Sequence, residues 1–238
     1  MLTPAQRHYE RVMAAQASQS PGNDLTPDTT AYERQLLKLA EDKRSLKTFQ
    51  SVRDKIELKR KLLPAYEAWV DGVILGAGGA QDDVFMTVLV WRIDVGDYIG
   101  ALAMARYAVA HDLRLPDQYG RSLPTLLAEE FADTTLQALK ADGECDLAAL
   151  DAVADLTADK DMFDEVRAKL FKARGLVSAA NAAALPVDDP QRAPGYALAL
   201  DHLRQALVFN DRVGVKKDIE RIERETKTTE SPPGTGDH

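Results

Sequence analysis

The residues from Ala31 to Leu63 contain neither proline nor glycine, and this stretch constrains the fold more than any other feature of the sequence. Its apolar residues recur at spacings of three, four or seven, the period of one face of an α-helix. They are Tyr32, Leu36, Leu39, Leu46, Phe49, Ile56 and Leu63. The pattern predicts one long amphipathic helix over residues 31–63, or a helical hairpin with a tight bend.

The rest of the chain repeats shorter helical patterns that turn residues separate. A helix over 65–75 precedes a second one, which Asp82 or Asp83 caps and which ends at Val95. No segment alternates apolar and polar residues over the length of a strand. Further helices are predicted at 98–111, 124–141, 146–157, 161–180, 195–210 and 213–225. The predicted fold class is therefore all-α.

A short pattern occurs twice, as GDYIGALAMAR at 96–106 and as PGYALALDHLR at 194–204. The copies share tyrosine, alanine, leucine and arginine at equivalent positions. With Trp91 ahead of it, the first copy resembles a tetratricopeptide hairpin, in which small residues let two helices pack closely. We expect a helical-hairpin, tetratricopeptide-like domain, with two ordinary antiparallel hairpins as the alternative.

Charge is unevenly distributed along the chain, whose formal net charge is −8. Residues 1–63 hold 12 Lys/Arg and 8 Asp/Glu, whereas residues 64–238 hold 18 and 30. Parts of opposite charge suit different partners. We expect a flexible N-terminal arm and linker over 1–30, a basic helical DNA-binding and oligomerisation region over 31–63, an acidic helical-repeat domain over 64–225 and a disordered tail over 226–238.

The basic residues of the 31–63 region give the clearest functional signal. Lysine and arginine neutralise DNA phosphates, and several of these side chains share one side of the predicted helix. A solvated charged stripe without a partner is the alternative interpretation. The candidate DNA-binding residues are Lys43, Arg44, Lys47, Arg53, Lys55, Lys59, Arg60 and Lys61.

Four aspartates, Asp82, Asp83, Asp94 and Asp97, suggest a nuclease, because two-metal nucleases need several carboxylates around Mg²⁺. They flank the two ends of a predicted helix about 16 Å long, whereas paired metal ions lie about 4 Å apart. Helix capping and a turn explain the same residues. We predict no catalytic site and no metal, and keep a Mg²⁺-dependent nuclease as the alternative.

Other signatures of chemistry are missing from the sequence. The glycines at 76–79 lack the Lys and Ser/Thr of a phosphate-binding loop, and the four histidines are scattered. The single cysteine, Cys145, excludes an internal disulfide framework and a cysteine-rich zinc site. The single cysteine fits a reducing cytoplasm, and the missing signatures lead us to expect no cofactor. Because no signal peptide or bilayer-spanning run is present, we expect no membrane contact.

Five segments together resemble the gpM-type small terminase subunit of temperate contractile-tailed phages. The match runs in order along nearly the whole chain. Its motifs are specific as a set, although none is a catalytic signature. The segments are LTPAQRH at 2–8, YERQLLKLAEDKRSLK at 32–47, GAQDDVFMTVLVWRIDVGDYIGALAMARYA at 79–108, DEVRAKL at 164–170 and GVKKDIERIERE at 214–225.

This resemblance implies a protein of the bacterial host cytoplasm that binds double-stranded phage DNA and self-associates into a ring-like homo-oligomer. It also implies a large terminase ATPase subunit as partner, for packaging DNA into proheads. Members carry an endonuclease label, which we take to describe cutting by the complex rather than by this subunit. A scaffold that mediates only protein contacts is the further alternative. The acidic end, ESPPGTGDH, departs from the expected basic tail and gives more weight to residues 31–63.

Overall fold

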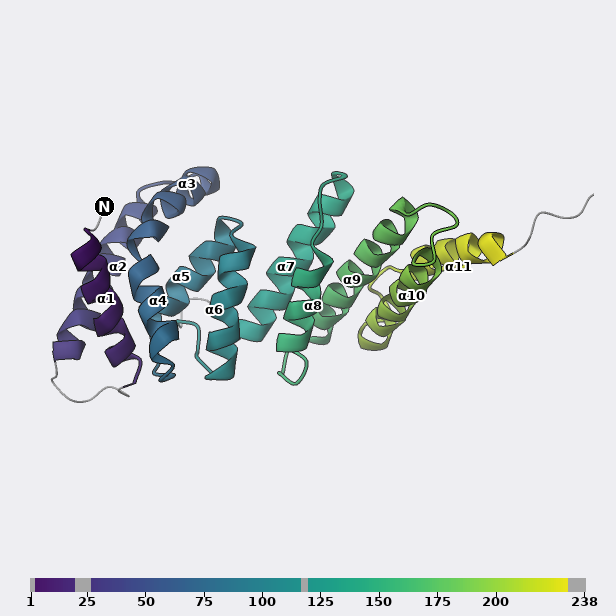
Figure 1. Ribbon diagram of the computed structural model, residues 1–238. Coiled ribbons are helices and arrows are strands. Elements are labelled where there is room, and N and C mark those ends of the chain that lie inside the picture. Colours follow the sequence, from purple (N-terminus) through teal and green to yellow (C-terminus); the bar gives the residue numbers. More distant parts are fainter. Residues whose placement is uncertain (1–2, 20–26, 117–119, 231–238) are drawn as a thin grey trace, which may run out of the picture. The chain divides into compact units, whose positions relative to one another are not determined.

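The structure is a computed structural model that describes residues 3–19, 27–116 and 120–230 of the chain. Those residues form eleven α-helices and one 3-10 turn and contain no strand, which confirms the all-α prediction. The chain divides into two compact units, Met1–Leu123 and Pro124–His238 (Figure 1). None of the helices in the described ranges is long and apolar enough to cross a bilayer.

Unit 1 contains a helical hairpin where the sequence allowed either a hairpin or one long helix. The chain leaves helical geometry after Lys47 and resumes it at Val52, because the Ser51 hydroxyl accepts a hydrogen bond from the Asp54 amide and caps the second helix. The elements are α1 (Pro4–Ala17), α2 (Pro27–Lys47), α3 (Val52–Leu62), the 3-10 turn η1 (Leu63–Ala65), α4 (Glu67–Gly76), α5 (Asp83–Asp94) and α6 (Tyr98–Ala110).

Helix α1 differs from the expected flexible arm, because it packs against α2 and α4. Its N-terminus is closed by a reciprocal capping box between Thr3 and Gln6. Glycines of α4 let the two backbones approach: a Cβ placed on Gly72 would lie 2.3 Å from the Arg11 carbonyl oxygen. The N-terminal residues are therefore part of the packed unit, and residues 20–26 of the expected linker lie outside the described residues.

Asp82 joins three helices of unit 1. One of its carboxylate oxygens accepts from the Phe85 amide at 2.8 Å and caps α5, and the other accepts from Trp69 Nε1 of α4 at 2.7 Å. Tyr32 of α2 stacks on Trp69, with ring centroids 6.0 Å apart. Burial raises the pKa of Asp82 to about 6, although the hydrogen bonds from Phe85 and Trp69 act in the opposite direction.

Unit 2 is built on the close antiparallel pair α9 and α10. Gly175 of α9 lies against Leu203 and the Ala199 carbonyl of α10, where any larger residue would clash. Alanines, Tyr196, Leu200 and residues of the last helix complete this core. The helices are α7 (Leu123–Lys140), α8 (Leu147–Leu156), α9 (Asp164–Ala184), α10 (Arg192–Phe209) and α11 (Lys216–Glu230).

Two features of the sequence take a different form in the structure. The duplicated pattern has unlike local structures, because Gly96 and Asp97 lie in the turn before α6 whereas Pro194 and Gly195 lie inside α10. The tetratricopeptide-like arrangement therefore stays a prediction. Helix α11 continues to Glu230, beyond the expected start of a disordered tail at 226, and residues 231–238 lie outside the described part.

The contact between α1 and α4 predicts a destabilising effect of Gly72→Ala. The new methyl group would also lie 2.6 Å from Ala14 Cβ, so the helices must separate. We expect a loss of about 1–3 kcal/mol from the free energy of unfolding, despite the preference of about 1 kcal/mol that alanine has over glycine in helices. Urea denaturation measures this.

The control is Gly143→Ala, whose new methyl group would meet its nearest atom at 3.4 Å. It is expected to change the free energy of unfolding by less than about 0.5 kcal/mol. A Gly72→Ala protein as stable as the original would contradict the packing of α1 against α4.

Asp82 predicts a specific pH dependence of stability. Its pKa of about 6 lies above the ordinary value of 3.8, so between these values the folded chain holds a proton that the unfolded chain has lost. The free energy of unfolding should therefore fall as pH rises from about 4 to about 6, by at most about 1.4 kcal/mol per pH unit.

Asp82→Asn supplies the comparison, because asparagine also caps helices but does not titrate. Urea denaturation at several pH values measures the free energy of unfolding of both proteins. As pH rises from about 4 to about 6, the unmodified protein should lose stability relative to the variant. A difference that is constant with pH would show that Asp82 does not titrate there.

Candidate functional site

The eight candidate cations all lie on the α2–α3 hairpin, but the structure uses them in different ways. Lys59 Nζ pairs with Asp94 at 2.5 Å, and Arg60 Nη2 donates to the Val95 carbonyl at 3.1 Å. Both contacts are with the C-terminal end of α5, where unpaired carbonyls and the helix dipole favour cations. Lys59 and Arg60 therefore dock α3 onto α5. Arg60 also pairs with Glu57 of its own helix.

Lys43 is half-buried on α2, and its charge interacts with that of Asp83 at the start of α5. Burial lowers its pKa, and the nearby Lys47 acts in the same direction, whereas Asp83 raises it. The side chain is thus partly committed to the packing between α2 and α5.

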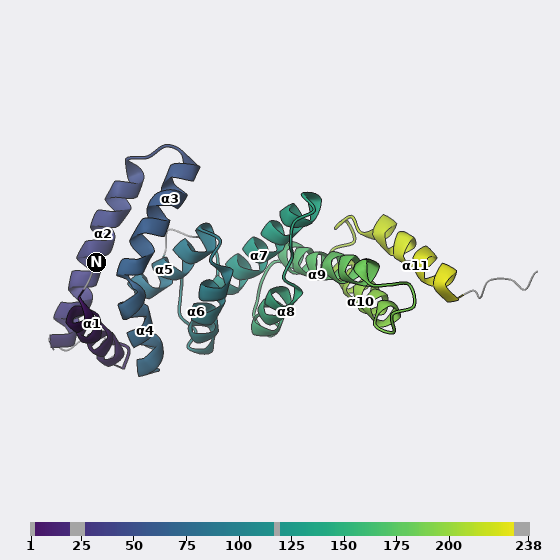
Figure 2. The same ribbon diagram turned by 45° about the horizontal axis from the view of Figure 1, so that its top comes forward.

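The five remaining cations have no ion-pair or hydrogen-bond partner for their side chains among the described residues. Four are exposed and one, Lys55, is half-buried. We name this set the hairpin cations: Arg44, Lys47, Arg53, Lys55 and Lys61. Arg44, Lys47, Arg53 and Lys55 lie within a few residues of the connection between α2 and α3, which is at one end of the hairpin (Figure 2), whereas Lys61 lies in the last turn of α3. Such uncompensated charges can bind a polyanion without breaking an existing ion pair.

The four candidate aspartates occupy the two ends of α5 and the start of α6. Asp82 is buried and holds Trp69 and the start of α5, as described above. Asp94 pairs with Lys59, and Asp97 pairs with Arg92 and caps α6 through the Gly100 amide. Helix α5 spans twelve residues, or about 16 Å between its ends. The acids at its two ends are thus too far apart to share one pair of metal ions.

The described residues contain no group of three or more His, Cys, Asp or Glu side chains placed to hold a metal ion. The residues of the nuclease alternative therefore do not fit a two-metal centre.

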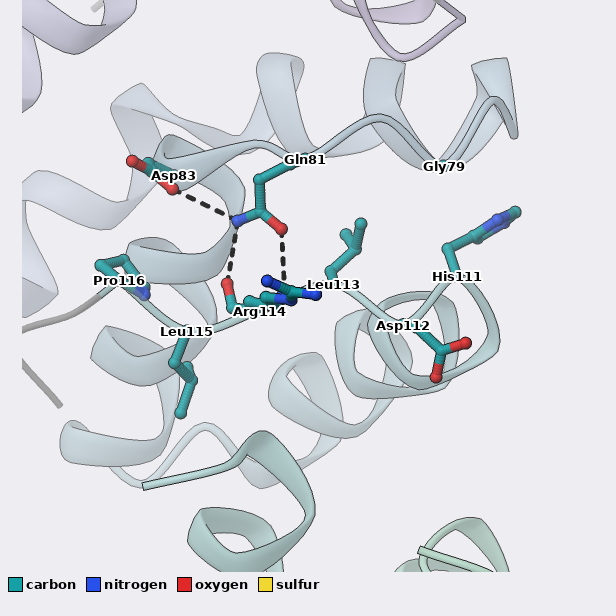
Figure 3. A pocket seen from close by; sticks show the side chains of 9 residues that line it. All are labelled: Gly79, Gln81, Asp83, His111, Asp112, Leu113, Arg114, Leu115 and Pro116. Carbon is teal, nitrogen blue, oxygen red and sulfur yellow. Dashed lines mark hydrogen bonds between the residues drawn. The ribbon is translucent and has the colours of Figure 1, made fainter. Parts of the chain in front are cut away.

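Asp83 lies instead beside a surface pocket of about 470 Å³ in unit 1 (Figure 3). Gln81 bridges two loops there: its Oε1 accepts from the Arg114 amide and its Nε2 donates to the Arg114 carbonyl, both at 2.9 Å. Figure 3 shows Asp83 and Asp112 on different sides of the pocket, so their carboxylates do not converge. Sequence reasoning missed Gln81, because only the fold brings residue 114 to it.

Unit 2 contains a groove of about 380 Å³ between α7, α9 and α11. Its floor is leucine and alanine, and Lys140, Lys172 and Arg221 line it. Lys172 donates to the Val213 carbonyl, and Arg221 pairs with Glu225. The groove offers apolar surface and positive charge but no acid, base or nucleophile arrangement for a reaction.

Comparison with known proteins identifies the family of the chain. Residues 36–165 match the family model described as phage small terminase subunit. The chain is 43% identical over 232 residues to the "Terminase, endonuclease subunit" of Escherichia phage P2, covering 98% of this chain and 89% of that protein. It is 24% identical to the "Probable terminase, endonuclease subunit" of Haemophilus phage HP1 (strain HP1c1), covering 90% and 80%. No solved structure gave a significant match. The chain belongs to the phage small terminase subunit family.

Proposed function

We propose that this subunit binds double-stranded phage DNA through the hairpin cations and acts in genome packaging with partner proteins. The single observation that carries the proposal is the set of five cations whose side chains have no ion-pair or hydrogen-bond partner among the described residues, on a chain whose net charge is −8. A protein of that charge repels DNA unless positive groups gather locally. The α2–α3 hairpin supplies such a local region.

The structure also supports a division among the basic residues that the sequence alone did not give. Lys59 and Arg60 hold α3 against α5, so they position the hairpin. Three of the hairpin cations, Arg53, Lys55 and Lys61, lie on the helix α3 that this contact holds in place. DNA binding is thus assigned to Arg44, Lys47, Arg53, Lys55 and Lys61, with Lys43 contributing through the field of its charge.

Two further parts of the proposal rest on family membership. We infer self-association into a ring-like homo-oligomer and recruitment of a large terminase ATPase subunit that drives DNA into the prohead, in the cytoplasm of the bacterial host. The glycines at 76–79 lack the Lys and Ser/Thr of a phosphate-binding loop, which supports placing ATP hydrolysis on a partner. In unit 2 the groove between α7, α9 and α11 has the apolar character of a protein-contact surface.

Charge reversal tests the DNA-binding proposal. The variant Arg44→Glu/Lys47→Glu/Arg53→Glu should weaken binding to a labelled duplex by at least about tenfold in about 0.1 M salt, measured by fluorescence anisotropy. If each side chain neutralises one phosphate, the slope of log affinity against log salt should become shallower by up to about three.

The matched control is Arg212→Glu/Lys216→Glu/Lys217→Glu, which makes the same change in net charge at three exposed residues of unit 2. It should alter the affinity by less than about threefold. Equal losses in the two variants would mean that net charge alone governs binding. Reversal of Lys59 or Arg60 is unsuitable, because it would also break the contact between α3 and α5.

A metal-dependent endonuclease is the second candidate, and the names of both relatives favour it. It would use Asp82, Asp83, Asp94 or Asp97 with Mg²⁺. The engagement of Asp82, Asp94 and Asp97 in caps and ion pairs supports the opposite assignment, in which a partner cuts the DNA. We expect the purified chain with Mg²⁺ to leave supercoiled plasmid intact. Nicking that disappears in Asp83→Asn or Asp94→Asn would establish the nuclease instead.

A third possibility is a helical scaffold that contacts DNA only through other proteins. The anisotropy measurement also decides this case, because a scaffold of that kind would give no signal with the isolated chain.

A further inference from the structure

The connection between α2 and α3 exposes two apolar side chains among the hairpin cations. Phe49 is 39% exposed and Val52 is 71% exposed, although short connections usually carry polar residues. Isolated apolar residues on a surface are ordinary, but here two occur three residues apart in one tight turn. We name residues 47–53 the hairpin tip.

The polar residues of the hairpin tip hold its backbone rather than cover the apolar ones. Ser51 caps α3 through the Asp54 amide, and the Thr48 hydroxyl donates to the Ser45 carbonyl at 2.7 Å. The backbone amides of Thr48 and Phe49 also continue the hydrogen bonding at the end of α2. Phe49 and Val52 are therefore presented on a turn with a fixed backbone.

The charge around the hairpin tip is strongly positive. Residues 43–56 hold five Lys/Arg and one acid, Asp54. Arg44 and Lys47 precede the apolar pair, and Arg53 and Lys55 follow it, all without a partner for their side chains among the described residues. Figure 2 shows the connection at one end of the α2–α3 hairpin.

This combination fits DNA better than a protein surface. Two side chains bury at most a few hundred Å², well below the roughly 800 Å² that each partner contributes to a stable protein interface. Proteins that bend DNA place an apolar wedge between base pairs while flanking Lys and Arg hold the phosphates on each side. The hairpin tip has both parts of that arrangement.

We propose that Phe49 and Val52 form a wedge that enters between stacked base pairs of bound double-stranded DNA and bends it. The inference rests on the proposed DNA binding and adds a mechanical action to it. Phe49 supplies the planar ring that can replace a lost stacking contact, and Val52 widens the wedge. The hairpin cations attract the duplex, and the docking of α3 on α5 resists the force needed to unstack a step.

Bending is measured on the full chain with a duplex of about 25 base pairs, about 85 Å long, that carries a donor and an acceptor dye at its ends. Binding of the unmodified protein should raise energy transfer. It should also bind a duplex with a central two-base bulge about tenfold more tightly than a perfect duplex, because the bulge has already lost part of its stacking.

The variant Phe49→Ser/Val52→Ser should bind the perfect duplex within about threefold of the unmodified protein but lose both the energy transfer and the bulge preference. Phe49→Leu/Val52→Ile keeps an apolar wedge and should retain bending. Leu37→Ser removes an exposed apolar side chain elsewhere on α2 and should behave as the unmodified protein. Thermal unfolding of each variant shows that the fold is kept.

The outcomes separate the two proposals. Duplex binding without a change in energy transfer, or bending that the serine double variant retains, overturns the wedge and leaves DNA binding standing. Absence of duplex binding by the unmodified protein overturns both. If the double variant instead changes the mass of the particle in solution, the hairpin tip is a contact between copies of the chain and the wedge is overturned.

Discussion

The docking of α3 on the C-terminal end of α5 is the interaction on which the functional account depends. Lys59 and Arg60 bind Asp94 and the Val95 carbonyl, and this fixes how α3 faces the rest of unit 1. The same contact engages two of the eight cations, whereas the hairpin cations have no ion-pair or hydrogen-bond partner among the described residues. The C-terminal end of a helix favours cations, which stabilises this contact. Lys59 and Arg60 therefore serve the fold, and their charges are less available for direct contact with DNA.

At the opposite end of α5, Asp82 holds this helix against its neighbours in unit 1. Its carboxylate links Trp69 of α4 to the start of α5, and Tyr32 of α2 stacks on the same indole. The neighbouring Asp83 amide donates to the Tyr32 hydroxyl at 3.0 Å. A residue that the sequence offered as a candidate of the nuclease alternative is thus occupied in packing, and burial raises its pKa.

Much of the fold could be predicted from local patterns, because capping and periodicity act over a few residues. The cap at Asp82, the turn at Gly96 and most helix boundaries follow from such signals. The packing of α1 could not be predicted, since it depends on Gly72 meeting Arg11 and Ala14, about sixty residues away. The hairpin break at 48–51 was one of two options, and Ser51 decides it.

The candidate site shows the same limit more clearly. Composition identified the basic stretch, but only tertiary contacts separate Lys59 and Arg60, which hold Asp94 and Val95 some 35 residues away, from the hairpin cations. The tetratricopeptide resemblance rested on shared residues whose local structures differ in the two copies. Family membership is secure from the comparisons, whereas the roles of individual residues come from the geometry.

Hydrogen–deuterium exchange of the full chain with and without duplex DNA tests the central claim most directly. The account predicts that DNA slows amide exchange in the hairpin around residues 44–55, while α9 and α10 exchange as they do in the free protein. Protection confined to unit 2, or no protection under conditions where the duplex is bound, would contradict the assignment of DNA binding to the hairpin cations.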